Sequence, residues 1–312
     1  FHRNFLPQSI KSWIDDLSQT MLGPAQVICR KIVEGAVFLV DSLSELGCVV
    51  SDKSAITASN HSLAVDIQQQ LAEKEIHLKI CDSVKDLGCD NLCGGNKRLV
   101  PVFKARVCKA KHKAGVVKHL LKQCKQVKRL VLTGVKPVIW GHQVLGVAPT
   151  VLKTIRTAIV DALGVKHPGG CATTALHLAG FGNSDPLVTF RADVVKDFVK
   201  AVNTSHLKFA IKSSWPVHVD KCTDAYRWQK VTGPTAATIA TLTDVGWSVP
   251  SADKWVDPLG RGWDIDFQDS TACVQVSEVF AETATLHVWA EVASQHAFAD
   301  GIDKGVDFCS AK

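Results

Sequence analysis

The first 90 residues alternate between strand-like and helix-like spacing of their hydrophobic positions. Residues 9–14 and 17–20 have strand composition on either side of an acidic dipeptide, which predicts two short strands joined by a hairpin turn. Over residues 28–46 the apolar side chains recur every three or four positions, so one face of a long helix is predicted to be apolar. Gly47 follows at the position where such a helix stops.

The next segment continues the alternation of strands and helices. Residues 48–57 predict a strand or hairpin interrupted by a polar turn, residues 62–73 predict a helix, and the alternating residues 76–80 predict a strand. The predicted order is strand, strand, helix, strand, helix, strand. This order is typical of an α+β fold in which helices pack on one face of a small antiparallel sheet.

The remaining two thirds of the chain have mostly helical spacing. From residue 104 onward, basic and apolar positions form a pattern that predicts a basic helical bundle, and the Gly-Gly-containing segment 166–170 is the clearest linker. Beyond this linker we expect a mostly helical part with one short hairpin. The elements predicted after residue 145 are helices at 150–163, 185–202, 234–245 and 271–298 and a hairpin at 254–266.

The length of 312 residues and the hydrophobic content of 46% are sufficient for more than one hydrophobic core. Together with the linker, the pattern predicts an α+β part at residues 1–103, a basic helical part at 104–165 and a mostly helical part at 171–312. No apolar run long enough for a membrane span or a secretory signal occurs, so we expect an intracellular protein, cytoplasmic or nuclear, whose 11 cysteines remain thiols. The sole methionine is Met21, which indicates a fragment of a longer reading frame.

Residues 91–160 carry 15 Lys and Arg and no Asp or Glu, and we call this segment the basic block. The segments on both sides are mildly acidic, so the net charge of +6 comes from the basic block. A solvated helix face normally mixes both signs of charge, whereas an acid-free block is typical of a surface that binds a polyanion, with nucleic acid as the leading partner. The residues expected to contact phosphates are Lys109, Lys113, Lys118, Lys122, Lys125, Lys128 and Arg129.

Asp15 and Asp16 stand next to each other at the predicted hairpin turn. Two carboxylates this close repel each other unless a cation lies between them, and their hard oxygen ligands suit Mg²⁺ or Mn²⁺ that also binds substrate phosphates. Aspartate is also a common turn residue, so a solvated turn remains the alternative. The spacing alone does not decide between these two interpretations.

Three motifs precede the basic block. They are Trp13-Ile14-Asp15-Asp16 before a long helix, then Leu46-Gly47-Cys48-Val49-Val50-Ser51-Asp52-Lys53, then Val84-Lys85-Asp86-Leu87-Gly88. Their order and spacing resemble the latter half of the palm of a reverse transcriptase of the non-LTR retrotransposon type, running into its thumb. The resemblance extends over most of the chain, but the motifs of known role lie in the first 90 residues.

The resemblance implies a role for each motif. Asp15 and Asp16 would be metal ligands in two-metal nucleotidyl transfer, and Lys53 would lie near the triphosphate and act as a catalytic acid. The basic block would form the thumb and connection, and residues 171–312 would be a tail of unknown role. The implied partners are an RNA template, a DNA primer and a dNTP. The implied primer-grip residues that contact nucleic acid are Lys85, Leu87 and Gly88.

Two features depart from the pattern of this family. Trp13 occupies a position where the family usually has Tyr or Phe. The strand that bears the third metal-binding carboxylate, and the fingers that close over the template, are expected upstream of Phe1. Because two carboxylates rarely hold both ions of a two-metal reaction, the complete parent is predicted to be the polymerase and the isolated chain to be inactive.

A second candidate metal set consists of Cys89, Cys93, Cys108 and His112, whose spacings resemble those of zinc ligands. The intervals differ from those of common zinc fingers, so ordinary thiols are the favoured interpretation. Two other functions remain open. One is a non-catalytic retroelement relic that binds RNA or DNA through the basic block, and the other is a helical scaffold whose basic face meets an acidic protein. The sequence does not predict an oligomeric state.

Overall fold

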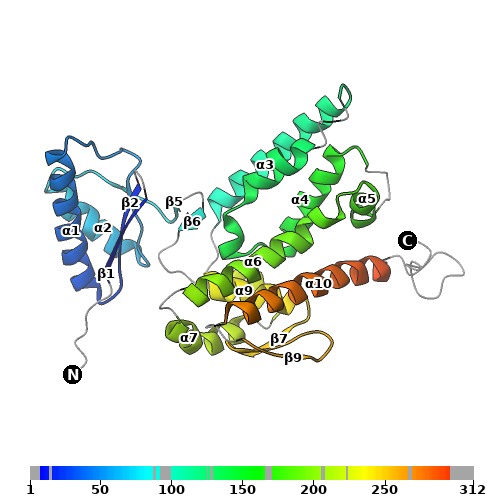
Figure 1. The fold of residues 1–312 in the computed structure, drawn as a ribbon. Helices are drawn as coiled ribbons and strands as arrows, with labels where there is room; N and C mark the ends of the chain where they lie inside the picture. Colours follow the sequence, from blue (N-terminus) through cyan, green and yellow to red (C-terminus); the bar gives the residue numbers. More distant parts are fainter. Residues whose placement is uncertain are drawn as a thin grey trace, which may run out of the picture. The chain divides into compact units, whose positions relative to one another are not determined.

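The computed structural model contains two compact units, residues 1–86 with 90–95 and residues 87–89 with 96–312, and each unit has its own hydrophobic core (Figure 1). The chain is an α+β protein that is mostly helical, as predicted. The residues that the structure describes are 8–13, 16–86, 89–91, 100–124, 126, 129–165, 171–204, 208–222, 224–265 and 269–295.

The first unit begins with a hairpin of two six-residue strands, β1 (Gln8–Trp13) and β2 (Asp16–Met21). The strands pair antiparallel, and Trp13 lies opposite Asp16, so the connection between them has two residues. The hairpin predicted around the acidic dipeptide is therefore confirmed.

The first unit contains two helices, α1 (Ala25–Glu45) and α2 (His61–Ala72). Helix α1 stops before Gly47, whose φ of +73° lies in the left-handed region that glycine adopts without steric cost. Helix α2 starts at Asn60, whose side chain accepts a hydrogen bond of 3.0 Å from the backbone N–H of Ser62. The small core between the helices consists of Cys29, Ile56, Leu63, Ala64, Ile67 and Leu71.

The other strands of the first unit are very short. Strands β3 (Ala55–Ile56) and β4 (Lys79–Ile80) pair parallel and are connected through α2, and β5 (Val84–Asp86) pairs with β6 (Cys89–Asn91). The predicted small antiparallel sheet is seen in part: β1–β2 is antiparallel, but β3–β4 is parallel, and β1–β2, β3–β4 and β5–β6 are separate pairs. A parallel pair needs a crossover connection, and α2 supplies it.

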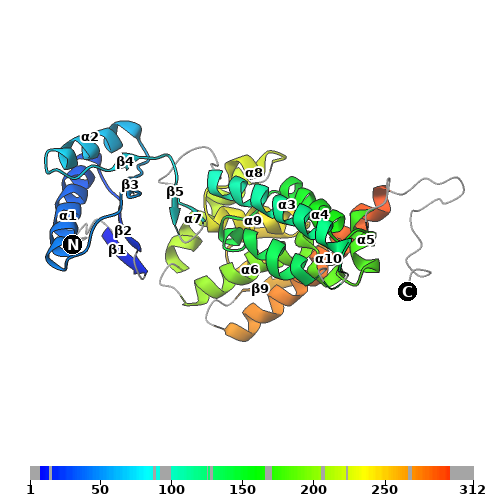
Figure 2. The same cartoon turned by 90° about the horizontal axis from the view of Figure 1, so that it is seen from above.

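The second unit consists of helices with one small sheet. Helix α3 lies beside α4, and α10 lies beside α6, in both Figure 1 and Figure 2. The elements are α3 (Pro101–Leu121), η2 (Val131–Val135), η3 (Lys136–Ile139), η4 (His142–Leu145), α4 (Pro149–Ala162), α5 (Ala172–Leu178), η5 (Gly182–Ser184), α6 (Pro186–Thr204), α7 (Lys208–Lys221), α8 (Arg227–Lys230), α9 (Pro234–Asp244), β7 (Ser248–Ser251), β8 (Lys254–Val256), β9 (Gly262–Asp264) and α10 (Ser270–Gln295).

The helices predicted in this unit are confirmed as α4, α6, α9 and α10, and the predicted hairpin is confirmed as β8–β9. Helix α4 stops before Gly164, whose φ is +68°. The pattern did not predict α5, α7 or β7, and β7 adds a third strand to the hairpin in the order β7-β8-β9.

Two hydrophobic cores fill the second unit. The first, which we call the α3–α4 core, contains Phe103, Val131, Leu152, Ile159 and Leu176. The second, which we call the tryptophan core, is built from α6, α7, α9, α10 and the three-stranded sheet. Its largest members are Phe198, Trp215, Trp247, Trp255 and Phe280.

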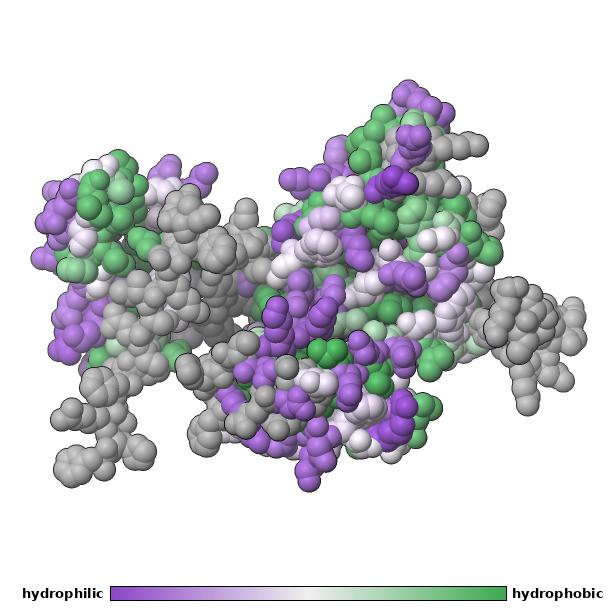
Figure 3. Space-filling model, in the orientation of Figure 1, coloured by the Kyte–Doolittle hydropathy of each residue, from purple (hydrophilic) through white to green (hydrophobic). Residues whose placement is uncertain are grey.

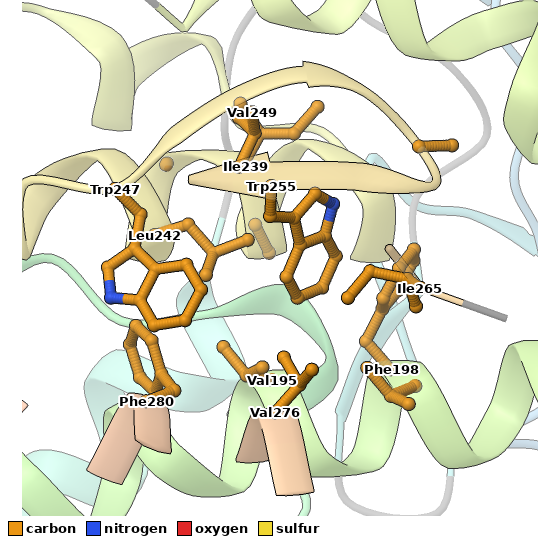
Figure 4. Packing of buried hydrophobic residues seen from close by; sticks show 14 of the residues in the cluster. Val195, Phe198, Ile239, Leu242, Trp247, Val249, Trp255, Ile265, Val276 and Phe280 are labelled. Atoms are coloured by element: carbon orange, nitrogen blue, oxygen red, sulfur yellow. The ribbon is translucent and has the colours of Figure 1, made fainter. Parts of the chain in front are cut away.

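Trp255 of β8 lies at the centre of the tryptophan core (Figure 4). It is fully buried, it stacks on Trp215 with ring centroids 6.2 Å apart, and Trp247 meets it edge-on at 6.5 Å. The indole N–H of Trp215 donates to the carbonyl of Val249, and that of Trp247 donates to Thr283 Oγ1. Aromatic pairs in these geometries stabilise a core beyond their buried area.

Helix α6 belongs to both cores. Phe190 and Val194 pack in the α3–α4 core, whereas Val195 and Phe198 pack in the tryptophan core. The helices before and after the predicted linker at 166–170 therefore share one continuous set of buried side chains, and that linker does not divide the hydrophobic core.

Candidate active site and nucleic-acid interface

The β1–β2 hairpin is the frame for the predicted carboxylate pair. Asp16 is the first residue of β2 and Asp15 belongs to the two-residue connection. Strand pairing fixes the backbone up to Trp13 on one side of this connection and from Asp16 on the other. Asp15 and the side chain of Asp16 lie outside the described residues, so metal binding by this pair stays a prediction.

Helix α1 supports the hairpin from one side. Gln19 of β2 donates from Nε2 to the backbone carbonyl of Lys31 at 3.4 Å, and Gly35 of α1 leaves room for the Gln19 side chain, because a Cβ there would meet Nε2 at 2.2 Å. Glycine inside a helix costs roughly 1 kcal/mol relative to alanine. At Gly35 the close approach of β2 is the physical reason for it.

The structure describes Lys53 and the backbone of Lys85, but not the rest of the primer-grip motif. Lys53 is exposed in a turn between α1 and β3, where its backbone N–H donates to Ser51 Oγ at 3.2 Å. Lys85 lies in β5, but its side chain is outside the described residues, as are Leu87 and Gly88. Their proposed contacts with substrate are therefore neither supported nor contradicted.

The structure describes half of the candidate zinc set. Cys108 and His112 are exposed one turn apart on α3, whereas the side chain of Cys89 and all of Cys93 lie outside the described residues. Across the ranges that the structure describes, no three His, Cys, Asp or Glu side chains are grouped as metal ligands. Zinc binding by this set stays a prediction.

Some of the cations of the basic block lie along helix α3 and at its C-terminal end, in two rows on either side of its buried face. The first row, which we call the lysine row, consists of Lys104, Lys111, Lys118 and Lys122, whose spacings of seven and four residues return to one side of a helix. All four side chains are exposed. Over α3, hydrophilic and hydrophobic atoms both reach the surface (Figure 3).

The second row has a structural role. Arg106 donates from Nη1 to the carbonyl of Trp140 at 2.7 Å, and Lys113 donates from Nζ to the carbonyl of Gly134 at 3.1 Å. Gly134 lies in the π-helical turn η2. Lys113 was expected to contact phosphate, but it satisfies a backbone carbonyl, and Lys109 remains the exposed cation on this side.

Within the described part of the basic block, three cations pair with acids from outside the block. Lys118 pairs with Asp161 at 3.0 Å, and Lys153 pairs with Glu291 at 3.3 Å. The third is Arg156, which bonds Thr173 and lies 3.5 Å from the buried Asp185. The acid-free sequence therefore overstated the positive charge that is left for a partner.

One buried and one half-buried group beside this surface have shifted pKa values. Burial raises the pKa of Asp185, and the attraction of Arg156 opposes that shift. Burial also lowers the pKa of the Lys136 ammonium, against the attraction of Asp193 and Asp185. Lys136 of η3 therefore belongs to the packed interior side of the basic block rather than to its exposed surface.

The exposed cations that remain without an ion pair among the described residues are Lys104, Lys109, Lys111, Lys122 and Arg129. Lys104 and Lys111 were not among the residues predicted to contact phosphates. Lys104, Lys111 and Lys118 are spaced seven residues apart, and this spacing in the sequence indicates that they share one side of the helix. Lys125 and Lys128 lie outside the described residues.

Replacing Lys113 by methionine is expected to lower the free energy of unfolding by about 1 kcal/mol, because the carbonyl of Gly134 loses a charged hydrogen-bond donor while the apolar stem remains. Urea unfolding measures the change. Lys109→Met, one turn earlier and exposed, is the matched control and should change stability by less than about 0.5 kcal/mol. Equal destabilisation by both variants would contradict the structural role of Lys113.

Comparisons with known proteins give no relative for this arrangement: no family model, no curated protein and no solved structure matches the chain. Among the described residues, no helix combines the length and the apolar character needed to cross a membrane.

Proposed function

We propose that the chain carries the distal palm and the thumb of an RNA-directed DNA polymerase of a retroelement, and that the complete polymerase performs nucleotidyl transfer. The observation that carries this proposal is the β1–β2 hairpin, whose antiparallel strands pair up to Trp13 and from Asp16 onward, on either side of the sequence position of the two consecutive aspartates. Helix α1 follows the hairpin and accepts a hydrogen bond from Gln19 of β2.

The chemistry of the donor set fits divalent cations. Carboxylate oxygens are the ligands that Mg²⁺ and Mn²⁺ prefer, and such ions activate a primer 3′-hydroxyl and stabilise the leaving pyrophosphate. In this proposal Asp15 and Asp16 hold the metal, and Lys53 supplies a proton to the pyrophosphate. A third carboxylate and the fingers come from the upstream part of the polymerase, so the chain alone is expected not to extend a primer.

The lysine row supports the binding of a primer–template duplex. Lys104 and Lys111 are two helical turns apart, about 10.5 Å along α3, so they can follow a phosphate backbone without reading its sequence. Lys122 extends the same side beyond the end of the helix. These cations are independent of the carboxylates, so metal binding and duplex binding can be tested separately.

The test measures Mn²⁺ bound to the chain in the presence of an RNA–DNA primer–template, by water proton relaxation. Changing Asp15→Asn together with Asp16→Asn is expected to remove the bound Mn²⁺ and to leave duplex affinity unchanged within about twofold, because the phosphate contacts lie elsewhere. In the polymerase completed by its upstream part, the same change is expected to stop Mg²⁺-dependent primer extension.

Asp41→Asn with Asp264→Asn is the matched control, since both carboxylates are exposed and neither is a predicted metal ligand. This control should retain both Mn²⁺ and the duplex. Undiminished Mn²⁺ in the Asp15 and Asp16 variant would refute the metal site, and loss of both ligands would show that the carboxylates are structural.

A second candidate function is a non-catalytic module that binds RNA or DNA. The exposed lysine row favours it, because this surface does not depend on the carboxylate pair. Duplex binding without any Mn²⁺ at the hairpin would support this module over the polymerase.

A further inference from the structure

The second unit contains a groove between α6 and α10 that none of the proposed polymerase residues lines. Its volume is about 630 Å³. One wall runs along α6 from Val188 to Asn203, and the other runs along α10 from Cys273 to Trp289. The groove lies in the part of the chain for which the resemblance implies no mechanism.

The two walls are antiparallel. Val288, near the end of α10, packs with the first half of α6 in the α3–α4 core, whereas Cys273, near the start of α10, packs with the second half of α6 in the tryptophan core. The stretch of α6 that lines the groove spans 15 residue steps, which corresponds to about 22 Å at 1.5 Å per residue. The groove is therefore as long as four turns of a helix.

The floor of the groove is apolar and its two rims have opposite charge. Val188, Ala192, Val199, Ala281 and Val288 supply apolar lining. The exposed charges along each rim stand four residues apart, on one side of their own helix. They are Lys196 and Lys200 on the α6 rim and Glu278 and Glu282 on the α10 rim.

One further acid lines the α6 wall. Asp193 is half-buried, burial raises its pKa, and the attraction of Lys136 opposes that shift. Lys196 also lies close enough to stabilise its anion. Lys136 and Lys196 therefore offset the charge of Asp193, and the exposed side chains that line the α6 wall, Lys196 and Lys200, are both positive.

We propose that this groove binds an amphipathic α-helix of a partner protein, about 15 residues long, with acidic side chains on the flank that meets α6 and basic side chains on the flank that meets α10. The apolar floor receives the apolar face of that helix. Phosphate groups of a nucleic acid or a membrane would be repelled by the acidic α10 rim, and a second copy of the chain would place one concave surface against another and leave both grooves unfilled.

The test uses the full chain and three fluorescent synthetic helices of 16 residues, a length of about four turns. All three carry the same apolar face. The first has one acidic and one basic flank, the second has two acidic flanks and the third has two basic flanks. Fluorescence anisotropy is expected to show at least about tenfold tighter binding of the first helix, since each of the others places like charges against one rim.

A rim variant reverses the preference. Lys196→Glu with Lys200→Glu makes both rims acidic, so the helix with two basic flanks is expected to become the tightest ligand. The matched control is Lys221→Glu with Lys254→Glu, two exposed lysines that do not line the groove, which should leave the original order unchanged. Equal affinity for the three helices, or the same order in the rim variant, would overturn the proposal.

A floor variant tests the location of binding. Ala281→Trp places a bulky side chain in the groove, so it is expected to abolish binding of all three helices while circular dichroism shows a folded chain. Retained binding would place the helices elsewhere and overturn the proposal. Sedimentation that reveals a dimer lost in Ala281→Trp, together with no peptide binding to the original chain, would assign the groove to a second copy instead.

Discussion

Replacing Lys104, Lys111 and Lys122 together by alanine is expected to flatten the dependence of duplex binding on salt. Each phosphate contact that is lost reduces the slope of log affinity against log salt by about 0.9, so three lost contacts reduce it by about 2.7. Between 50 and 200 mM salt, the original chain should therefore lose about 40-fold more affinity than the variant loses. Fluorescence anisotropy with an RNA–DNA duplex over a salt series measures both slopes.

The three positions were chosen because their side chains are exposed and form no ion pair among the described residues, unlike Lys118, which is already paired with Asp161. Lys74, Lys221 and Lys254 are exposed lysines elsewhere in the chain, and their triple alanine variant has the same net charge. This control should keep the original slope. If both triple variants flatten the slope equally, net charge rather than the lysine row governs binding.

Replacing Trp255 by alanine is expected to cost about 3–5 kcal/mol of the free energy of unfolding. Its indole is 0% exposed and touches Trp215 and Trp247, so its removal leaves a cavity that the surrounding sheet and helices cannot fill without repacking. Chemical unfolding monitored by circular dichroism measures the loss. Trp140, which is 50% exposed, is the control, and Trp140→Ala should cost less than about 1 kcal/mol.

A conservative variant separates volume from hydrogen bonding at this position. Among the described residues, the indole N–H of Trp255 has no hydrogen-bond partner. Trp255→Phe removes that buried donor and retains most of the aromatic surface, so it should cost less than half of the loss seen with alanine. A phenylalanine variant as unstable as the alanine variant would show that the indole N–H, rather than the volume, is required.

The sequence predicted the elements whose periodicity is long and unbroken. Helices α1 and α6 have apolar residues at helical spacing over five turns, and glycines mark the ends of α1 and α4. Helix α7 was not predicted because Pro216 lies inside it and because its less exposed face mixes the apolar Ile211, Trp215 and Val219 with the polar Ser214 and His218. Proline removes a backbone donor, so a sequence pattern that contains it does not indicate a helix interior.

Strand pairing was the weaker part of the prediction. Strands β3 and β4 have two residues each, too few to show a period of two, and the choice between parallel and antiparallel pairing depends on the path of α2. The β1–β2 hairpin was predictable because its two longer strands flank a short polar turn, which is a local signal.

In the candidate site, as in the strands, the local features were predictable from the sequence and the long-range contacts were not. The spacing of lysines within α3 is local, so it indicates which cations share one side of the helix. The ion pairs that occupy other cations are not local, since Lys118 is 43 residues from Asp161 and Lys153 is 138 residues from Glu291. Charge counts along the chain do not reveal such pairs, because they form through tertiary packing.

Because α6 packs in both cores of the second unit, the chain cannot be divided at residues 166–170 without exposing buried side chains. A cut at residues 166–170 would leave α6 with its Phe190 side no longer covered by α3 and α4, while Val195 and Phe198 stayed packed. The shorter piece would in turn expose Leu152 and Ile159, which now lie at the centre of the α3–α4 core. The basic helices and the region that follows them therefore form one structural unit. Recombination or gene fusion can transfer this unit intact, but dividing it would expose apolar surface on both pieces and make them prone to aggregation.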